Sequence, residues 1–326
     1  MMTNTFKYDL EHYTDSEEAA EILSRYLNLG SLSLCLGAGV SYSHSLPNWS
    51  ELVFRCFIRC ESNKLSLSKD LKIRVDNDIV NRFENLSNDD LKKIIDSIKS
   101  YLDSDEKYFQ TVKKSLYERV NFDFSLAKKD TLIALSSLML GKTRGTVKNI
   151  LTYNFDSVLE WYMMINGLRC NILSPNKIII NNADVNITHI HGFLPSEEVS
   201  HIYQDSDFLV FSRKEFEDRN LDPYDLWKEI MNDFFRKNIF LTFGLGEDSL
   251  VEDICPHLRV LLKNKYETKY LNRDEPFGYA ILSDSKQDHK DELIETGIVP
   301  IYMKIKEMPN FLFSIVQKAS KEANIS

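Results

Sequence analysis

The stretch 32–41 reads Leu32-Ser33-Leu34-Cys35-Leu36-Gly37-Ala38-Gly39-Val40-Ser41, and it decides the predicted fold. Leucine at every second position predicts a strand, and the strand ends abruptly at the first glycine. A strand that runs into two glycines and turns toward a helix lets backbone N–H groups approach a phosphate closely. Position 42, where the dinucleotide fingerprint has its third glycine, is Tyr. A phosphate-binding loop and a plain tight turn therefore both stay open on this motif alone.

The rest of the chain alternates between short apolar runs and helical patterns. We expect further strands near 147–152, 187–190, 239–243, 277–282 and 298–303, and helices near 155–165, 223–236, 250–262, 288–295 and 310–322. This alternation predicts an α/β fold with a Rossmann-like, doubly wound parallel sheet and helices on both faces. We expect a single domain, 1–326, in which 65–145 forms an inserted helical subdomain.

Composition and charge exclude several classes of protein. Of 326 residues, 43% are hydrophobic and 27% charged, and 40 basic against 49 acidic side chains give a formal net charge of −9. A chain without a basic excess is not expected to bind nucleic acid or anionic membranes directly. No run approaches the roughly 18 apolar residues of a membrane span, and the N-terminus lacks a signal-peptide pattern. We expect a cytoplasmic protein whose five scattered cysteines are reduced thiols.

Two segments place polar side chains at predicted strand ends. Thr152-Tyr153-Asn154-Phe155-Asp156 stands where a strand gives way to a helix, at the sheet edge where α/β folds bind ligands. Asn154 or Asp156 is equally suited to be an ordinary helix N-cap. In His189-Ile190-His191-Gly192 the two histidines of a strand would point to one face, and Gly192 would let a ligand come close.

Two other segments are weaker signals, and no metal site is expected. Leu46-Pro47-Asn48-Trp49 starts a helix that Asn48 can cap, and Trp49 suits either a cofactor lid or the core. Residues 242–249 run from a strand into Gly244 and then to Asp248, as a second phosphate-binding wall or as a loop with a cap. No Cys or carboxylate cluster accompanies the histidines, and Cys56–Cys60 is a single CxxxC.

Taken together and in this order, these segments resemble the sirtuin-like superfamily, and more closely the NAD+ hydrolases of bacterial anti-phage defence systems. The resemblance covers about residues 30 to 260. It rests on the motifs at 37–41, 46–49, 152–156, 191–192 and 242–248.

The resemblance implies NAD+ as the substrate and assigns two catalytic residues. Asn154 would fix the nicotinamide ribose and position the attacking water, and His191 would be the general base near the ribose hydroxyls. Asp156 would hold the nicotinamide carboxamide, and Trp49 would cover the cofactor. The implied NAD+-binding residues are Gly37, Ala38, Gly39, Ser41, Trp49, Thr152, Asp156, Gly192, Gly244 and Asp248.

The function implied is hydrolysis of NAD+ to nicotinamide and ADP-ribose by an NAD-depleting effector in abortive infection. Such an enzyme needs restraint, so the resemblance implies a homo-oligomer or a partner such as a HerA-type ATPase or a separate sensor. ADP-ribosyl transfer, protein deacylation and a catalytically silent nucleotide-binding subunit are the alternatives. Deacylating sirtuins carry paired CxxC zinc ligands, and this chain has no CxxC. A Rossmann reductase would need the missing third glycine and an acidic ribose partner.

Overall fold

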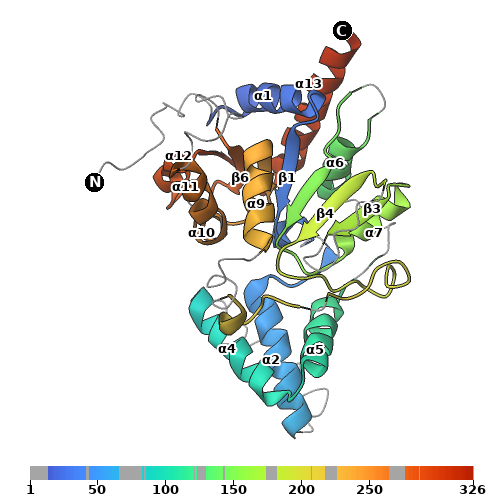
Figure 1. Cartoon of the computed structure of the whole chain (residues 1–326), viewed down its shortest axis with the longest axis vertical. Coiled ribbons are helices and arrows are strands. Elements are labelled where there is room, and N and C mark those ends of the chain that lie inside the picture. The colour runs from blue at the N-terminus through green and yellow to red at the C-terminus, as the bar shows by residue number, and fades with distance from the viewer. Residues whose placement is uncertain are drawn as a thin grey trace.

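The computed structural model confirms the α/β fold (Figure 1). Among the residues that it describes, seven parallel strands form one sheet. It describes residues 14–41, 44–65, 83, 86–120, 122, 130–141, 144–173, 182–206, 208–216, 226–263, 276–285 and 287–325. The strands are β1 (Leu32–Leu36), β2 (Asn149–Thr152), β3 (Cys170–Leu173), β4 (Val185–His189), β5 (Ile239–Phe243), β6 (Gly278–Ser283) and β7 (Ile298–Met303).

The strand order is β3-β4-β2-β1-β5-β6-β7, so the sheet is doubly wound around its central strand. The chain leaves β1 toward β2 on one side and returns to β5 on the other. The carboxyl end of β1 is therefore the topological switch point, where open α/β sheets bind their ligands. The sequence analysis missed β3, which is a four-residue edge strand with an asparagine inside it.

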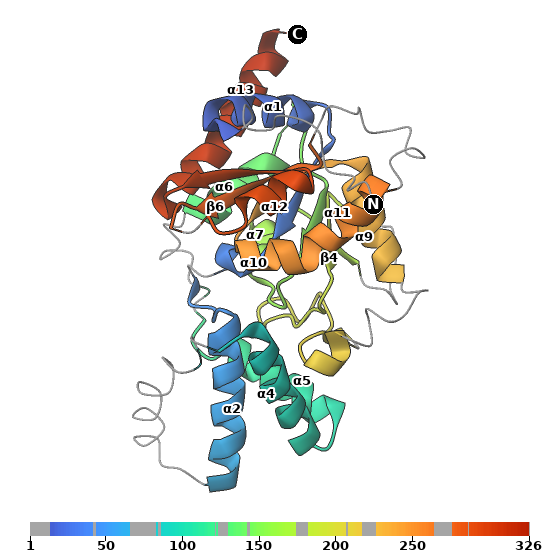
Figure 2. The same cartoon turned by 90° about the vertical axis from the view of Figure 1, so that its left-hand side faces the viewer.

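Helices cover both faces of the sheet (Figures 1 and 2). They are α1 (Ser16–Asn28), α2 (Trp49–Leu65), α4 (Asn88–Tyr101), α5 (Asp105–Tyr117), α6 (Asp130–Met139), α7 (Val158–Ile165), α9 (Leu226–Lys237), α10 (Glu247–Ser249), α11 (Cys255–Lys263), α12 (Lys290–Glu295) and α13 (Met308–Ile325). A π-helical segment, Leu250–Ile254, joins α10 to α11, where the sequence predicted one regular helix. The predicted start of α9 at residue 223 lies outside the described residues.

The alternation of side chains along each strand divides the core into two layers. Leu34 of β1 and Leu241 of β5 pack into the layer with α1, α6, α7 and α13. Cys35 and Phe240, one residue along from them, point into the opposite layer with α9, α11 and α12. All five residues of β1 are buried. Burial on both faces is the reason why strands of a parallel sheet are almost continuously apolar.

Helices α2, α4 and α5 pack on one another in a bundle beyond the carboxyl edge of the sheet (Figure 2). Ser87 caps α4 by accepting a hydrogen bond from the Asp90 N–H. The bundle includes α2, which mostly precedes the predicted insertion of 65–145. It leaves out α6, which falls within that range but packs against α13. The bundle is placed so that α4 faces the switch point.

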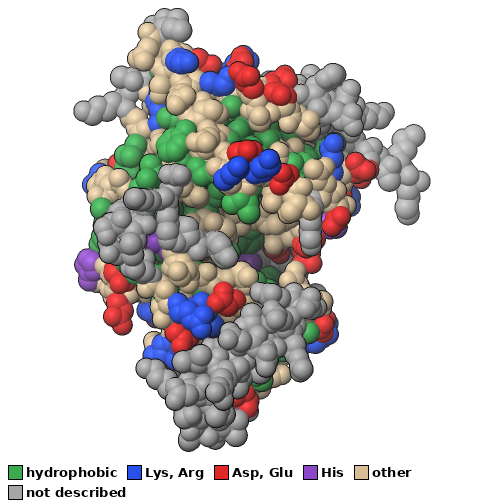
Figure 3. Space-filling model, turned by 180° about the vertical axis from the view of Figure 1, so that it is seen from behind, with side chains coloured by type: hydrophobic (Ala, Val, Ile, Leu, Met, Phe, Trp, Pro, Cys, Tyr) green, Lys and Arg blue, Asp and Glu red, His purple; other side chains and the backbone are tan. Residues whose placement is uncertain are grey.

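Acidic and basic side chains are interspersed on the rear face of the molecule (Figure 3). Within the described residues, no helix is long and apolar enough to cross a membrane.

Candidate functional site

Two glycine turns lock together at the switch point. The Gly37 N–H donates to the Phe243 carbonyl at 2.9 Å, and the Gly39 N–H donates to the Gly244 carbonyl at 3.0 Å. A Cβ on Gly39 would lie 2.7 Å from the Gly244 Cα, and Gly244 itself has φ +75°. Only glycine permits this approach of backbone to backbone. The glycines thus bring the ends of β1 and β5 into contact.

This packing changes which backbone groups are left for a ligand. The sequence left open whether the first turn is a phosphate-binding loop or a plain tight turn, and the N–H groups of Gly37, Gly39 and Ser41 donate within the protein. Among the described residues, the N–H groups of Ala38, Leu245 and Gly246 have no hydrogen-bond partner. All three residues line the same cavity. The backbone donors therefore come from both turns rather than from the first alone.

Asn154 is held against the first turn by its side chain and against the end of β2 by its main chain. Its Nδ2 donates to the Gly37 carbonyl at 3.1 Å, and its N–H donates to Oγ1 of Thr152 at 3.2 Å. Oδ1 of Asn154 receives no hydrogen bond from the residues that the structure describes. That oxygen is therefore available to accept a hydrogen bond from a ligand in the cavity.

His191 stands beside Asn154 in a wall of aromatic rings. The centroid of its imidazole lies 5.2 Å from that of Tyr153 and 5.1 Å from that of Phe216, both in edge-to-face geometry. Gly192 has φ +104°, and a Cβ there would meet the Phe208 carbonyl at 2.4 Å. The turn that carries His191 therefore requires glycine at this position. Phe208 and Leu209 occupy the space next to Gly192 where the sequence predicted a ligand.

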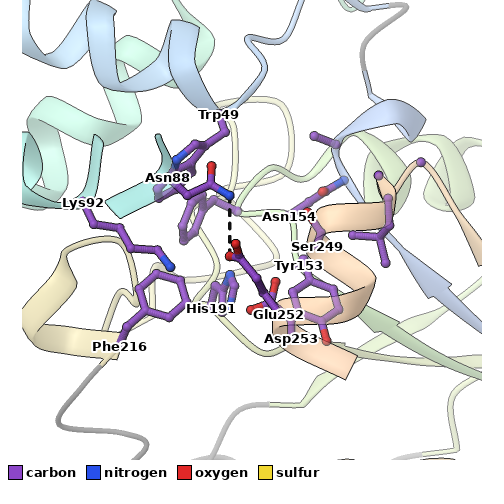
Figure 4. A pocket seen from close by; sticks show the side chains of 15 residues that line it. Trp49, Asn88, Lys92, Tyr153, Asn154, His191, Phe216, Ser249, Glu252 and Asp253 are labelled. Atoms are coloured by element: carbon purple, nitrogen blue, oxygen red, sulfur yellow. Dashed lines mark hydrogen bonds between the residues drawn. The ribbon is translucent and has the colours of Figure 1, made fainter. Parts of the chain in front are cut away.

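A cavity of about 260 Å³ brings these groups together (Figure 4). Of the residues predicted for the site, Ala38, Trp49, Asn154, His191 and Gly244 line it. The Trp49 ring stands edge-on to Phe211, with 4.7 Å between centroids.

The cavity also has charged walls that the sequence analysis missed. Asn88 and Lys92 reach it from α4, and Glu252 and Asp253 from the π-helical segment opposite (Figure 4). Nδ2 of Asn88 donates to Oε2 of Glu252 across the cavity at 3.5 Å. Nζ of Lys92 lies 4.1 Å from the centre of the Phe216 ring. No sequence signal marked Lys92, because it lies beside the apolar face of a helix that is far from the motifs in sequence.

One of these acidic groups has a shifted pKa. Burial raises the pKa of Asp253 to about 6, and the ammonium of Lys92 opposes that shift. A π-helical turn is a frequent feature of functional sites, since the extra residue turns neighbouring side chains to a new direction. Here it lies where Glu252 and Asp253 meet the cavity.

Three predicted site residues lie behind the cavity wall. Oδ1 of Asp156 accepts hydrogen bonds from the Ser41 hydroxyl at 2.9 Å and the Val158 N–H at 3.0 Å. Burial raises the pKa of Asp156 to about 6, and the N–H of Val158 opposes the shift. Thr152 is buried and donates to the Leu36 carbonyl. Asp156, Ser41 and Thr152 thus form a layer behind Asn154. Their direct contact with a ligand stays a prediction.

Asp248 points away from the cavity. Its carboxylate lies 3.1 Å from Nε2 of His289 and is mostly exposed. Neighbouring Glu247 accepts hydrogen bonds from the His289 N–H and from the hydroxyl of Tyr302. The acidic side chains near the start of α10 therefore hold this helix to the α12 and β7 region, and Asp248 is not among the residues that line the cavity.

Within the described ranges, no group of three or more His, Cys, Asp or Glu is arranged to hold a metal ion. All five cysteines are free thiols. Burial raises the pKa of the Cys56 thiol to about 12, so the thiolate that zinc requires is disfavoured there.

Comparison with known families agrees with this geometry. Residues 148–301 match the family model described as a SIR2-like domain. Just under half of the chain is therefore similar to a SIR2-like domain. The match begins at β2 and ends within β7, so it includes Asn154, His191 and Gly244. The matched family is one that binds NAD+. No curated protein matches the chain.

Proposed function

We propose that this SIR2-like protein hydrolyses NAD+ to nicotinamide and ADP-ribose. The observation that carries the proposal is the presence of Asn154 and His191 in one cavity at the switch point, beside backbone donors from both glycine turns. The N–H groups of Ala38, Leu245 and Gly246 suit a diphosphate. Positions 244 and 246 are glycines, so no side chain there keeps the ligand away from the backbone.

The chemistry of the cleaved bond matches the residues near Asn154. Breaking the N-glycosidic bond builds positive charge on the ribose, so an acceptor fixed beside it stabilises the transition state. The amide oxygen of Asn154 is such an acceptor, held by the two hydrogen bonds of its N–H groups. The imidazole of His191 can take the proton of a ribose hydroxyl or of the attacking water. The rings of Tyr153 and Phe216 cover two sides of the imidazole and so limit the access of water to it.

The charges of the cavity favour one orientation of the substrate. Glu252 and Asp253 repel a diphosphate and attract the cationic nicotinamide ring, and Lys92 on the facing wall offsets only part of their negative charge. The glycine turns carry no acidic side chain and supply N–H donors. The ring of NAD+ is therefore expected to lie toward the π-helical segment.

The biological role is part of the same proposal. A cytoplasmic enzyme that destroys NAD+ would kill its own cell unless it were restrained. We infer an effector that depletes NAD+ in an infected cell, held inactive as a homo-oligomer or by a partner such as a HerA-type ATPase or a separate sensor.

The test is incubation of the purified protein with NAD+, with nicotinamide and ADP-ribose followed by chromatography. Hydrolysis predicts equal amounts of the two products. Asn154→Ala and His191→Ala should each lower turnover by about 10²–10⁴-fold. His201→Ala changes an exposed histidine outside the cavity and is the matched control. Nicotinamide in excess of ADP-ribose would indicate transfer to an acceptor, and full activity in both cavity variants would refute the site.

A further inference from the structure

A buried pair of titratable side chains lies directly behind Asn154. His189 ends β4 and Glu160 lies in the first turn of α7, with side chains that are 2% and 0% exposed. Nε2 of His189 is 2.7 Å from Oε1 of Glu160, and Nδ1 is 2.7 Å from the main-chain oxygen of Asn154. The imidazole therefore connects α7 to the loop that carries Asn154.

These two hydrogen bonds fix the number of protons that the pair holds. A carbonyl oxygen can only accept, so Nδ1 of His189 carries a proton and donates it to Asn154. The contact between Nε2 and Oε1 needs one more proton, on the ring or on the carboxyl group. Glu160 and His189 together are electrically neutral in either case, which lowers the cost of burying them.

The position of Glu160 is unusual for a carboxyl group. It is the one charged residue of α7, whose sequence is otherwise Val-Leu followed by Trp-Tyr-Met-Met-Ile. Its Oε2 has no hydrogen-bond partner among the described residues. A buried carboxyl group of this kind costs folding free energy that an apolar side chain would not. The only hydrogen bond of this carboxyl group among the described residues is the one to His189, so the cost of burying it is offset by that contact alone.

We propose that Glu160 and His189 are positioning residues that hold Asn154 in the orientation required for cleavage of NAD+, an inference that rests on the proposed function. Glu160 orients the imidazole, and the imidazole holds the Asn154 carbonyl. Because Thr152 holds the N–H and Gly37 holds the side-chain amide, the residue is fixed at three points. These three hydrogen bonds fix the direction in which Oδ1 of Asn154 points into the cavity.

The first test compares Glu160→Gln with Glu160→Leu. Glutamine can donate to Nε2 of a neutral His189 and preserve the bridge, so kcat should stay within about threefold of the wild-type value. Leucine removes the bridge, and kcat should fall by about 10–100-fold while KM for NAD+ changes less than about threefold. In an Asn154→Ala background, Glu160→Leu should change kcat less than about twofold, because the effect passes through Asn154.

A second measurement does not depend on turnover. In the NMR spectrum of the 15N-labelled protein, Nδ1 of His189 should carry a slowly exchanging proton, assigned by its loss in His189→Gln. The side-chain amide protons of Asn154 should shift or exchange faster in Glu160→Leu and stay unchanged in Glu160→Gln. This readout applies even if Glu160→Leu is less stable, provided that the Glu160→Gln protein folds.

The outcomes separate the two proposals. An unprotonated Nδ1, unchanged Asn154 amide protons in Glu160→Leu, or an equal fall in kcat in both backgrounds would overturn the positioning role. A wild-type protein that does not cleave NAD+, but shows the expected NMR changes, would refute the proposed reaction and support the bridge to Asn154.

Discussion

Replacing Gly244 by alanine should weaken the contact between the two glycine turns. A Cβ at this position would lie 2.8 Å from the Val40 nitrogen and 2.9 Å from the Gly37 oxygen, both of which are backbone atoms that cannot turn aside. The left-handed φ of +75° adds a cost of about 1–2 kcal/mol for any residue with a Cβ. Overpacking adds about 1–3 kcal/mol. Together these give a loss of about 2–5 kcal/mol in the free energy of unfolding.

Urea unfolding of three variants separates the two contributions. Gly30 has φ +68° with nothing within 4 Å of its Cβ position, so Gly30→Ala should show the backbone cost of about 1–2 kcal/mol alone. Gly246 has a negative φ and open space, so Gly246→Ala should lose no stability. If Gly244→Ala costs no more than Gly30→Ala, the turns of β1 and β5 do not touch as described.

Three further predictions concern buried groups. Burial raises the pKa of Asp156 to about 6 from about 3.9 in the unfolded chain, so the folded state holds the proton more tightly. Its contribution to stability is present below about pH 4 and is lost as the pH rises to about 6. Urea unfolding at pH 4 and pH 7 should therefore show the stability difference between Asp156→Asn and wild type move by about 2 kcal/mol in favour of the variant. Tyr117→Phe removes the acceptor of the Ser157 N–H and the donor to the Leu194 carbonyl, and thermal or urea unfolding should show a loss of about 1–3 kcal/mol. Metal analysis should find far less than one zinc per chain, since the thiolate of Cys56 is disfavoured; one tightly bound zinc would contradict this.

Much of the fold was predictable from local sequence pattern. The strand Ile239–Phe243 and the strand Ile298–Met303 lie where the apolar runs placed them. The Asn48 cap is confirmed by a 2.9 Å hydrogen bond from the Glu51 N–H. These features depend on neighbours in sequence, so their residues carry the whole signal. Edge strand β3 was missed because its four residues owe their conformation to pairing with β4.

The site was predictable only where a motif sits at the end of a strand. Asn154 and His191 meet because β2 and β4 are neighbours in a parallel sheet, which the α/β pattern implies. Lys92 and Asp253 come together because the helical bundle folds over the switch point, and no local pattern encodes that contact. The strand pattern grouped His189 with His191, but His189 is paired with Glu160 beneath the cavity.

The most direct test of the central claim is a crystal structure of the His191→Ala protein soaked with NAD+. The substitution is expected to leave the substrate uncleaved in the cavity. The diphosphate should then lie at the N–H groups of Ala38, Leu245 and Gly246, with the nicotinamide ribose beside Asn154. NAD+ bound elsewhere on the protein, or density for intact NAD+ with its ribose far from Asn154, would contradict the account.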